Sequence, residues 1–172
     1  MRAKNHIHIV KMGGTIEFID PSYDAINKRL MKLDSTIEGY LRNLIKPHFN
    51  FSVENVAEKD SREITEEDRN KLVKTIEETP HENILVTHGT FTMVKTVEFL
   101  AEHFSVGGGG KKIILTGSMI PISGFTISDA GFNLGFAIAS FSSIEPGVYL
   151  SMNGGIFRFD EVKKNADLFR FE

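Results

Sequence analysis

The 172-residue sequence contains no cysteine. This absence excludes a disulfide framework, a thiolate metal site and a cysteine nucleophile. Neither sign of charge is in large excess, because the formal net charge is −3. The chain therefore lacks the basic surface of nucleic-acid-binding proteins and the polybasic segment of membrane-surface proteins. No apolar run reaches the roughly 18 residues that a membrane-spanning helix needs. We expect neither a nucleic acid nor a membrane as a partner.

We expect no secretory signal at the amino terminus, since residues 1–5 lead directly into a strand-like pattern. Hydrophobic residues make up 41% of the chain and charged residues 25%, which is an ordinary balance for a globular protein. The length is sufficient for one domain with its own core. We therefore expect a single cytoplasmic domain over residues 1–172, without a linker that divides it.

Five short segments have the alternating or continuously apolar patterns of β-strands: 6–10, 49–56, 83–87, 112–116 and 147–152. Helical patterns lie between them: from an N-cap at Thr36 to Pro47, from a capping box of Thr65 and Asp68 to Pro80, from the turn after the third strand to about Phe104, and over 128–142. Strands that alternate with helices predict an α/β fold. We expect a doubly wound, mainly parallel five-stranded sheet with helices on both faces, Rossmann-like or flavodoxin-like.

The remaining segments have no such period. Residues 17–35 are predicted to form a flexible loop, and 160–165 a charged tail. The four glycines of 107–110 follow a helix and precede a strand. A phosphate cradle has the opposite placement, after a strand and before a helix, so this run is interpreted as a plain connection.

Hydroxyls and glycines recur where the predicted strands end: Gly13-Gly14-Thr15, Asp60-Ser61, His88-Gly89-Thr90, Gly117-Ser118 and Asn153-Gly154. Ligands of open α/β sheets bind outside the carboxyl ends of the strands. Hydroxyls that converge there with exposed backbone N–H groups are suited to acyl transfer or to anion binding.

The same segments carry a family resemblance. Gly13-Gly14-Thr15-Ile16, Asp60-Ser61, His88-Gly89-Thr90-x-Thr92-Met93, Gly117-Ser118-Met119 and Phe132-Asn133-Leu134 stand in the order and spacing of the bacterial-type L-asparaginase/glutaminase family. The chain resembles the amino-terminal domain of that family. Its last residues, 164–165 and 170–172, are similar to the end of short, single-domain members. The resemblance implies a threonine amidohydrolase that acts on a small amide such as asparagine or glutamine and needs no cofactor.

The resemblance also implies roles for individual residues. Thr15 matches the nucleophile, which forms an acyl-enzyme that water releases. Thr90 matches a second catalytic threonine that works with a lysine, for which Lys164 fits best and Lys163 is the alternative. Tyr23, on the loop after the first strand, is the candidate for the tyrosine that assists the nucleophile.

A second group of residues is implied to hold the substrate. Ser61 matches the residue that binds the substrate carboxylate, with Asp60 beside it, and the carbonyl of Ser118 matches a contact to the amide. Backbone N–H groups at Thr15 and Thr90 are implied to form the oxyanion hole. The full set predicted to line the substrate site is Gly14, Asp60, Ser61, Gly89, Phe91 and Ser118.

Phe91 departs from the family pattern, which has aspartate at this position. That carboxylate binds the substrate's α-ammonium and belongs to the Thr–Lys–Asp network, and phenylalanine can do neither. Loss of one charge-assisted hydrogen bond, worth about 1.5–3 kcal/mol, lowers activity by about 10- to 150-fold. We therefore expect impaired activity, or a substrate without an α-amino group. The sequence leaves open whether the ring fills the pocket as a core residue or contacts the substrate.

Other interpretations follow from the same residues. A catalytically inactive pseudoenzyme that binds a small carboxylate or a protein partner is the alternative function, and Phe91 favours it. A flavin or nucleotide binder fits the architecture but lacks a phosphate motif. His88 is expected to fix its turn, and His6 with His8 lacks a third metal ligand nearby, so no metal is expected. The resemblance covers only the family's first domain, so we expect the second domain to be absent, and a homodimer is expected from base rates alone.

Overall fold

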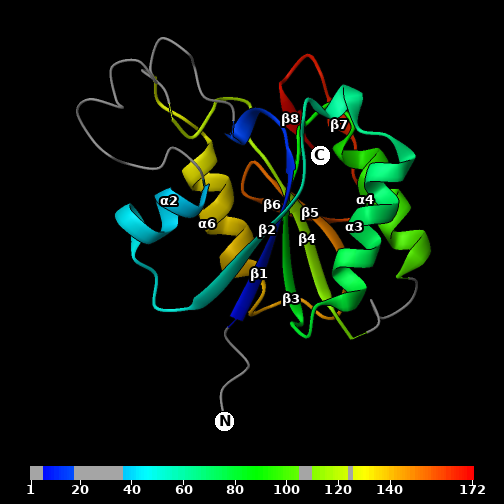
Figure 1. Ribbon diagram of the computed structural model, residues 1–172. Helices are drawn as coiled ribbons and strands as arrows, with labels where there is room; N and C mark the ends of the chain where they lie inside the picture. The colour runs from blue at the N-terminus through cyan, green and yellow to red at the C-terminus, as the bar shows by residue number, and fades with distance from the viewer. Residues whose placement is uncertain (1–5, 18–36, 105–109, 124–125) are drawn as a thin grey trace.

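The computed structural model describes residues 6–17, 37–104, 110–123 and 126–172. Its centre is a six-stranded sheet in the order β2-β1-β3-β4-β5-β6 (Figure 1). The strands are β1 (His6–Gly13), β2 (Asn50–Lys59), β3 (Asn83–Thr87), β4 (Lys112–Thr116), β5 (Gly147–Met152) and β6 (Gly155–Arg158). Neighbours from β2 to β5 pair in parallel, and β6 is antiparallel to β5. The predicted mainly parallel α/β sheet is confirmed.

Helices cover both faces of the sheet, as the sequence predicted. Figure 1 shows α3 (Glu66–Glu78) and α4 (Met93–His103) on one side, with α2 (Ile37–Gly39) and α6 (Ala130–Ser140) on the other. A π-helical segment, Tyr40–Ile45, continues α2. The capping box that predicted α3 is present, because the Thr65 hydroxyl accepts from the Asp68 N–H and the Asp68 carboxylate accepts from the Thr65 N–H.

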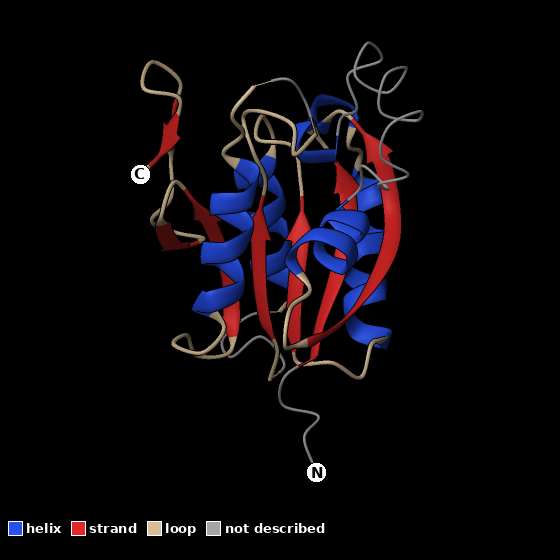
Figure 2. Cartoon of the chain, turned by 90° about the vertical axis from the view of Figure 1, so that its left-hand side faces the viewer, coloured by secondary structure: helices blue, strands red, loops and turns tan. Residues whose placement is uncertain are grey.

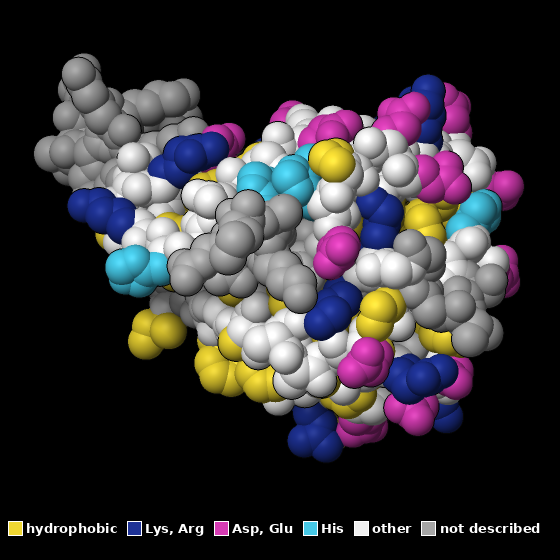
Figure 3. Space-filling model, turned by 90° about the horizontal axis from the view of Figure 1, so that it is seen from below, with side chains coloured by type: hydrophobic (Ala, Val, Ile, Leu, Met, Phe, Trp, Pro, Cys, Tyr) yellow, Lys and Arg dark blue, Asp and Glu magenta, His cyan; other side chains and the backbone are white. Residues whose placement is uncertain are grey.

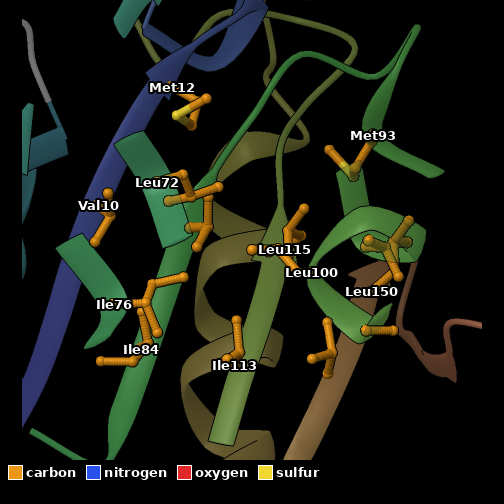
Figure 4. Packing of buried hydrophobic residues seen from close by; sticks show 14 of the residues in the cluster. Val10, Met12, Leu72, Ile76, Ile84, Met93, Leu100, Ile113, Leu115 and Leu150 are labelled. Carbon is orange, nitrogen blue, oxygen red and sulfur yellow. The ribbon is translucent and has the colours of Figure 1, made fainter. Parts of the chain in front are cut away.

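Successive side chains of the strands serve two separate cores. In β1, Val10 and Met12 pack in the cluster that includes Leu72 of α3, whereas Ile7 and Ile9 pack in the cluster on the α2 and α6 side. This division follows from the two-residue period of a strand. Figure 4 shows the first cluster, in which the labelled side chains of strands and helices meet on one face of the sheet. The nearly continuous apolar runs of the strands therefore reflect burial on both faces.

The C-terminal part differs from the predicted charged tail. It forms β6 and then a short hairpin of β7 (Lys164–Asn165) and β8 (Arg170–Phe171). Met152 pairs with Gly155, so Asn153 and Gly154 make a two-residue turn with φ angles of 55° and 76°. Asn-Gly is a strong hairpin signal because both residues tolerate positive φ. The predicted five-stranded sheet therefore omits a sixth strand, β6, which the Asn153-Gly154 turn indicates in the sequence.

The turns at the carboxyl ends of the five parallel strands lie at the same edge of the sheet. Figure 2 shows the C-terminal hairpin beside the sheet, at the end opposite the N-terminus. Most of the predicted loop 17–35 and the glycines of 107–109 lie outside the described residues. Among the helices that are described, none combines the length and apolarity required to cross a bilayer.

Candidate active site

A lysine and a threonine far apart in the sequence meet at this edge of the sheet. Lys164 Nζ, from β7, donates a hydrogen bond of 2.9 Å to Oγ1 of Thr90, which lies in the turn between β3 and α4. The Thr90 hydroxyl in turn faces Met119 Sδ at 3.6 Å. Burial lowers the pKa of Lys164 from its ordinary value. Lys163 is exposed, and its backbone N–H pairs with the carbonyl of Glu172. The structure therefore brings Lys164, and not Lys163, to Thr90.

Glycines let three strand exits touch one another. Gly14 has a φ of 88°, and a Cβ there would lie 2.3 Å from the backbone nitrogen of Gly89. A Cβ on Gly89 would lie 2.7 Å from the Ser61 hydroxyl oxygen. No side chain fits at either glycine without displacement of its neighbours. The turns after β1, β2 and β3 are thus in contact, and Thr15 follows directly in the 3-10 turn Thr15–Glu17.

A buried chain of hydrogen bonds supports the turn that carries Thr90. Arg69 Nε donates to Thr96 Oγ1 at 3.1 Å, so the Thr96 hydroxyl proton is free to point to His88 Nε2 at 2.9 Å. His88 then carries its proton on Nδ1 and donates it to the Gly89 carbonyl at 2.8 Å. Complete burial lowers the pKa of His88 to about 4. The imidazole is therefore neutral at pH 7 and structural in position, behind the site and not in it.

Ser61 and Asp60 differ sharply in their surroundings. Ser61 is 2% exposed and its carbonyl accepts from the Thr92 hydroxyl at 2.6 Å. Its own Oγ is buried without a hydrogen-bond partner among the described residues. The Asp60 carboxylate is exposed and accepts from Arg62 N, Nε and Nη2. These bonds hold the pKa of Asp60 at about 2. Ser61 thus has an unused hydroxyl, while Asp60 is occupied by Arg62.

The surface formed by Phe91, Lys164 and Arg62 is called the mouth of the site below, and the Phe91 side chain is 65% exposed there. Lys164 Nζ lies 4.5 Å from the ring centroid and Arg62 Cζ lies 4.8 Å from it. Both distances are within the range of cation–π interactions. Of the two interpretations left open by the sequence, the buried core residue is wrong. The ring instead forms part of the surface around Thr90 and Lys164.

The β4 exit is fixed by residues whose contacts sequence reasoning missed. The Asp129 carboxylate accepts from the backbone N–H groups of Met119 and Ile120, and Asn133 Nδ2 donates to the Gly117 carbonyl and to Asp129. Ser118 is fully buried between them, and its hydroxyl donates to the Ile120 carbonyl. Asn133 stands in the Phe132-Asn133-Leu134 motif, so its position was marked, but its partners depend on the fold. Tyr23 lies outside the described residues.

Histidines gather at the opposite edge, where the parallel strands begin. His6 Nε2 and His8 Nδ1 both contact the Ser52 hydroxyl, at 2.9 and 2.8 Å, and the His81 ring stacks on His6 at a centroid distance of 3.7 Å. A cavity of about 300 Å³ adjoins them, lined by His8, Ser52, Glu54, Thr75, Glu78, Thr79, Pro80 and His81. Figure 3 shows histidine side chains near the middle of this face, among charged side chains of both signs.

The carboxyl edge of the sheet carries hydroxyls, a lysine and backbone N–H groups. This is the edge at which parallel α/β folds bind their ligands. The sequence model of the asparaginase N-terminal domain matches residues 6–168. The chain therefore belongs to the asparaginase family, as its N-terminal domain. No curated protein matches the sequence.

Solved L-asparaginases share the fold. L-asparaginase I from Vibrio cholerae is 24% identical with a TM-score of 0.76, and the match covers 99% of this chain and 51% of that one. The thermostable L-asparaginase from Thermococcus kodakarensis is 23% identical with a TM-score of 0.76, covering 97% and 50%. A probable cytoplasmic L-asparaginase from Campylobacter jejuni is 28% identical with a TM-score of 0.67, covering 98% and 51%. This chain spans about half the length of these relatives.

Proposed function

We propose that this protein is an amidohydrolase of the asparaginase type, in which Thr15 is the nucleophile toward a small amide. The observation that carries the proposal is the 2.9 Å hydrogen bond from Lys164 Nζ to Thr90 Oγ1, beside the glycine contact that positions Thr15. A partly buried lysine on a threonine hydroxyl is an arrangement suited to proton transfer. Burial lowers the pKa of Lys164, so its ammonium releases a proton more readily than an exposed lysine does.

The proposed reaction has two halves. Thr15 Oγ1 adds to the amide carbon, and its proton passes through the Thr90–Lys164 pair to the leaving nitrogen, which departs as ammonia. Water then adds to the resulting ester, and the acid leaves as Thr15 regains its proton. We propose Tyr23 as an additional group that activates Thr15.

The backbone N–H groups of Thr15 and Thr90 are the proposed oxyanion donors. The Gly89 carbonyl accepts from His88 Nδ1 at 2.8 Å, and that carbonyl belongs to the same peptide group as the Thr90 N–H. A hydrogen bond to the oxygen of a peptide group polarises its N–H, so the buried chain from Arg69 strengthens this donor. His88 is thus a positioning residue for the oxyanion hole.

Ammonia release tests the proposal. Asparagine, glutamine and their des-amino amides are supplied to the parent protein and to the Thr15→Ala, Lys164→Met and Lys163→Met variants. We expect Thr15→Ala to abolish release, and Lys164→Met to lower it by about 10²- to 10⁴-fold, the usual weight of general acid–base catalysis. Lys163→Met is the matched control and retains the parent rate. Release that survives Thr15→Ala would exclude Thr15 as the nucleophile.

A pseudoenzyme is the second candidate function, and the exposed Phe91 ring favours it because that position offers no carboxylate to the site. A protein that binds a small carboxylate and releases no ammonia from any amide would have this function.

We further propose that residues 1–172 act as one cytoplasmic domain and assemble as a homodimer. Sedimentation equilibrium at micromolar concentration decides between the dimer and a monomer.

A further inference from the structure

Two cations face one exposed aromatic ring at the mouth of the proposed site. Lys164 Nζ and Arg62 Cζ lie 4.5 and 4.8 Å from the centroid of the Phe91 ring. Any part of a ligand that lies on the ring is therefore close to two positive charges. The ring itself offers a ligand an apolar surface that carries no oxygen or nitrogen acceptor.

The two positive charges are not equally compensated. The Asp60 carboxylate binds Arg62 through both of its oxygens, at 2.9 Å each. Lys164 donates to the neutral Thr90 hydroxyl, and among the described residues no carboxylate forms an ion pair with it. The mouth of the site therefore retains one positive charge that a bound anion can neutralise.

A buried hydroxyl near the same mouth also lacks a partner. Ser61 Oγ, 2% exposed, has no hydrogen bond within the described part of the chain. It lies against Gly89, next to Thr90. A hydroxyl that is removed from water without a partner favours a ligand that supplies an acceptor. A carboxylate supplies such an acceptor and the missing negative charge together.

We infer that Phe91, Lys164, Arg62 and Ser61 form a subsite for a carboxylate-bearing amide without an ammonium group, such as the monoamide of a four-carbon dicarboxylic acid. This inference rests on the proposed function of the same site. The carboxylate meets Ser61 and Lys164, and the methylene groups lie on the Phe91 ring. An ammonium on the same carbon chain would face two cations, and the Asp60 carboxylate beside them is already paired with Arg62.

Equilibrium binding tests the subsite without turnover. Succinate and L-aspartate share two carboxylates and differ in one ammonium group, so titration calorimetry with each reports the preference directly. We expect succinate to bind at least about 10-fold more tightly than L-aspartate, and Phe91→Asp to reduce or invert this ratio. Lys164→Gln should weaken succinate by about 10-fold or more, since a charged hydrogen bond is lost. Lys163→Gln, at the adjacent exposed lysine, is the matched control and leaves both affinities unchanged.

Several outcomes would overturn the subsite. Equal or tighter binding of L-aspartate contradicts it, as does succinate binding that is indifferent to Lys164→Gln, or no binding of either acid. Tighter binding of benzamide than of succinate would assign the ring to an aromatic substrate instead.

Ammonia release from succinate monoamide separates this inference from the proposed function. Preference for succinate without any release retains the subsite and removes the reaction. Release from asparagine that depends on Thr15, without the binding preference, retains the reaction and removes the subsite.

Discussion

We expect Phe91 to determine which substrates the turn after β3 can accept. Its ring is exposed and lies 4.5 Å from Lys164 Nζ and 4.8 Å from Arg62 Cζ, so an aspartate at this position would have cations already in place beside it. We expect Phe91→Asp to raise the rate of ammonia release from asparagine by about 10-fold or more, because a charge-assisted hydrogen bond to the ammonium is gained. Phe91→Asn is the control, since it removes the ring without adding charge. A folded Phe91→Asp protein with no gain would show that other features limit the activity.

His88 makes stability depend on pH. Its pKa is about 4 in the folded chain, against an ordinary value of 6.5. The unfolded chain therefore binds the proton more readily, and the stabilisation, full above pH 6.5, is lost as the pH falls toward 4. The contribution at pH 7 is about 3 kcal/mol, because each pKa unit corresponds to about 1.4 kcal/mol. Burial also lowers the pKa of His6 and of His8, which adds loss in the same direction.

Urea unfolding at a series of pH values measures this effect. As the pH is lowered, we expect the free energy of unfolding to fall less steeply in His88→Gln than in the parent. The control His103→Gln, at an exposed histidine of α4, keeps the parent slope. An imidazole resonance of His88 that titrates near 6.5 would contradict the prediction.

At the scale of elements, the contact between the β1 and β3 exits decides whether Thr15 and Thr90 share a site. A Cβ on Gly89 would lie 2.7 Å from Ser61 Cβ and Oγ and 3.2 Å from Gly14 Cα, so Gly89→Ala forces the β1 and β2 exits away from the β3 exit. We expect a loss of about 1–3 kcal/mol in the free energy of unfolding, the usual cost of overpacking.

Gly135 of α6 provides the matched control for Gly89→Ala. A Cβ at Gly135 would meet nothing within 4 Å, and the residue lies inside the helix Ala130–Ser140. Gly135→Ala should therefore stabilise the protein, by about 0.5–1 kcal/mol, through helix propensity. Thermal unfolding compares both variants with the parent. Equal stability of the two variants would mean that the turns can separate at little cost.

At the scale of the whole molecule, the strands and helix boundaries that depend on local sequence patterns could be predicted from the sequence. Periodicity identified the five parallel strands, and the Thr65–Asp68 capping box marked the start of α3. The contact between Lys164 and Thr90 joins residues 74 positions apart, and no local period encodes such a meeting. For Lys164, family resemblance supplied the expectation and the fold supplied the geometry.

Other features could not be predicted because they depend on neighbours in space. The position of Phe91 between two cations requires β7 and the turn after β2 to approach the same ring. Phenylalanine is usually a core residue, and here tertiary context overrides that tendency. The β6 strand is a different case, since Asn153-Gly154 marked its turn in the sequence.

The hairpin that carries Lys164 is short. Its strands have two residues each. Phe171 is buried, and its N–H donates to Asn153 Oδ1 at 3.0 Å. So small a unit opens locally at a lower free energy than the central strands. We expect the Phe171 amide to exchange with deuterium faster than the amides of β3 and β4; equal protection would contradict this expectation.

If the hairpin opens before the rest of the chain unfolds, the protein can be folded and still unable to carry out the proposed reaction. Each opening withdraws Lys164 from Thr90 and Phe171 from the first cluster, while the sheet and Thr15 stay in place. Warming would then stop the proposed reaction reversibly, at a temperature well below the one at which the whole chain unfolds. In this 172-residue protein, the rate of ammonia release would then report the fraction of molecules in which the C-terminal hairpin is closed.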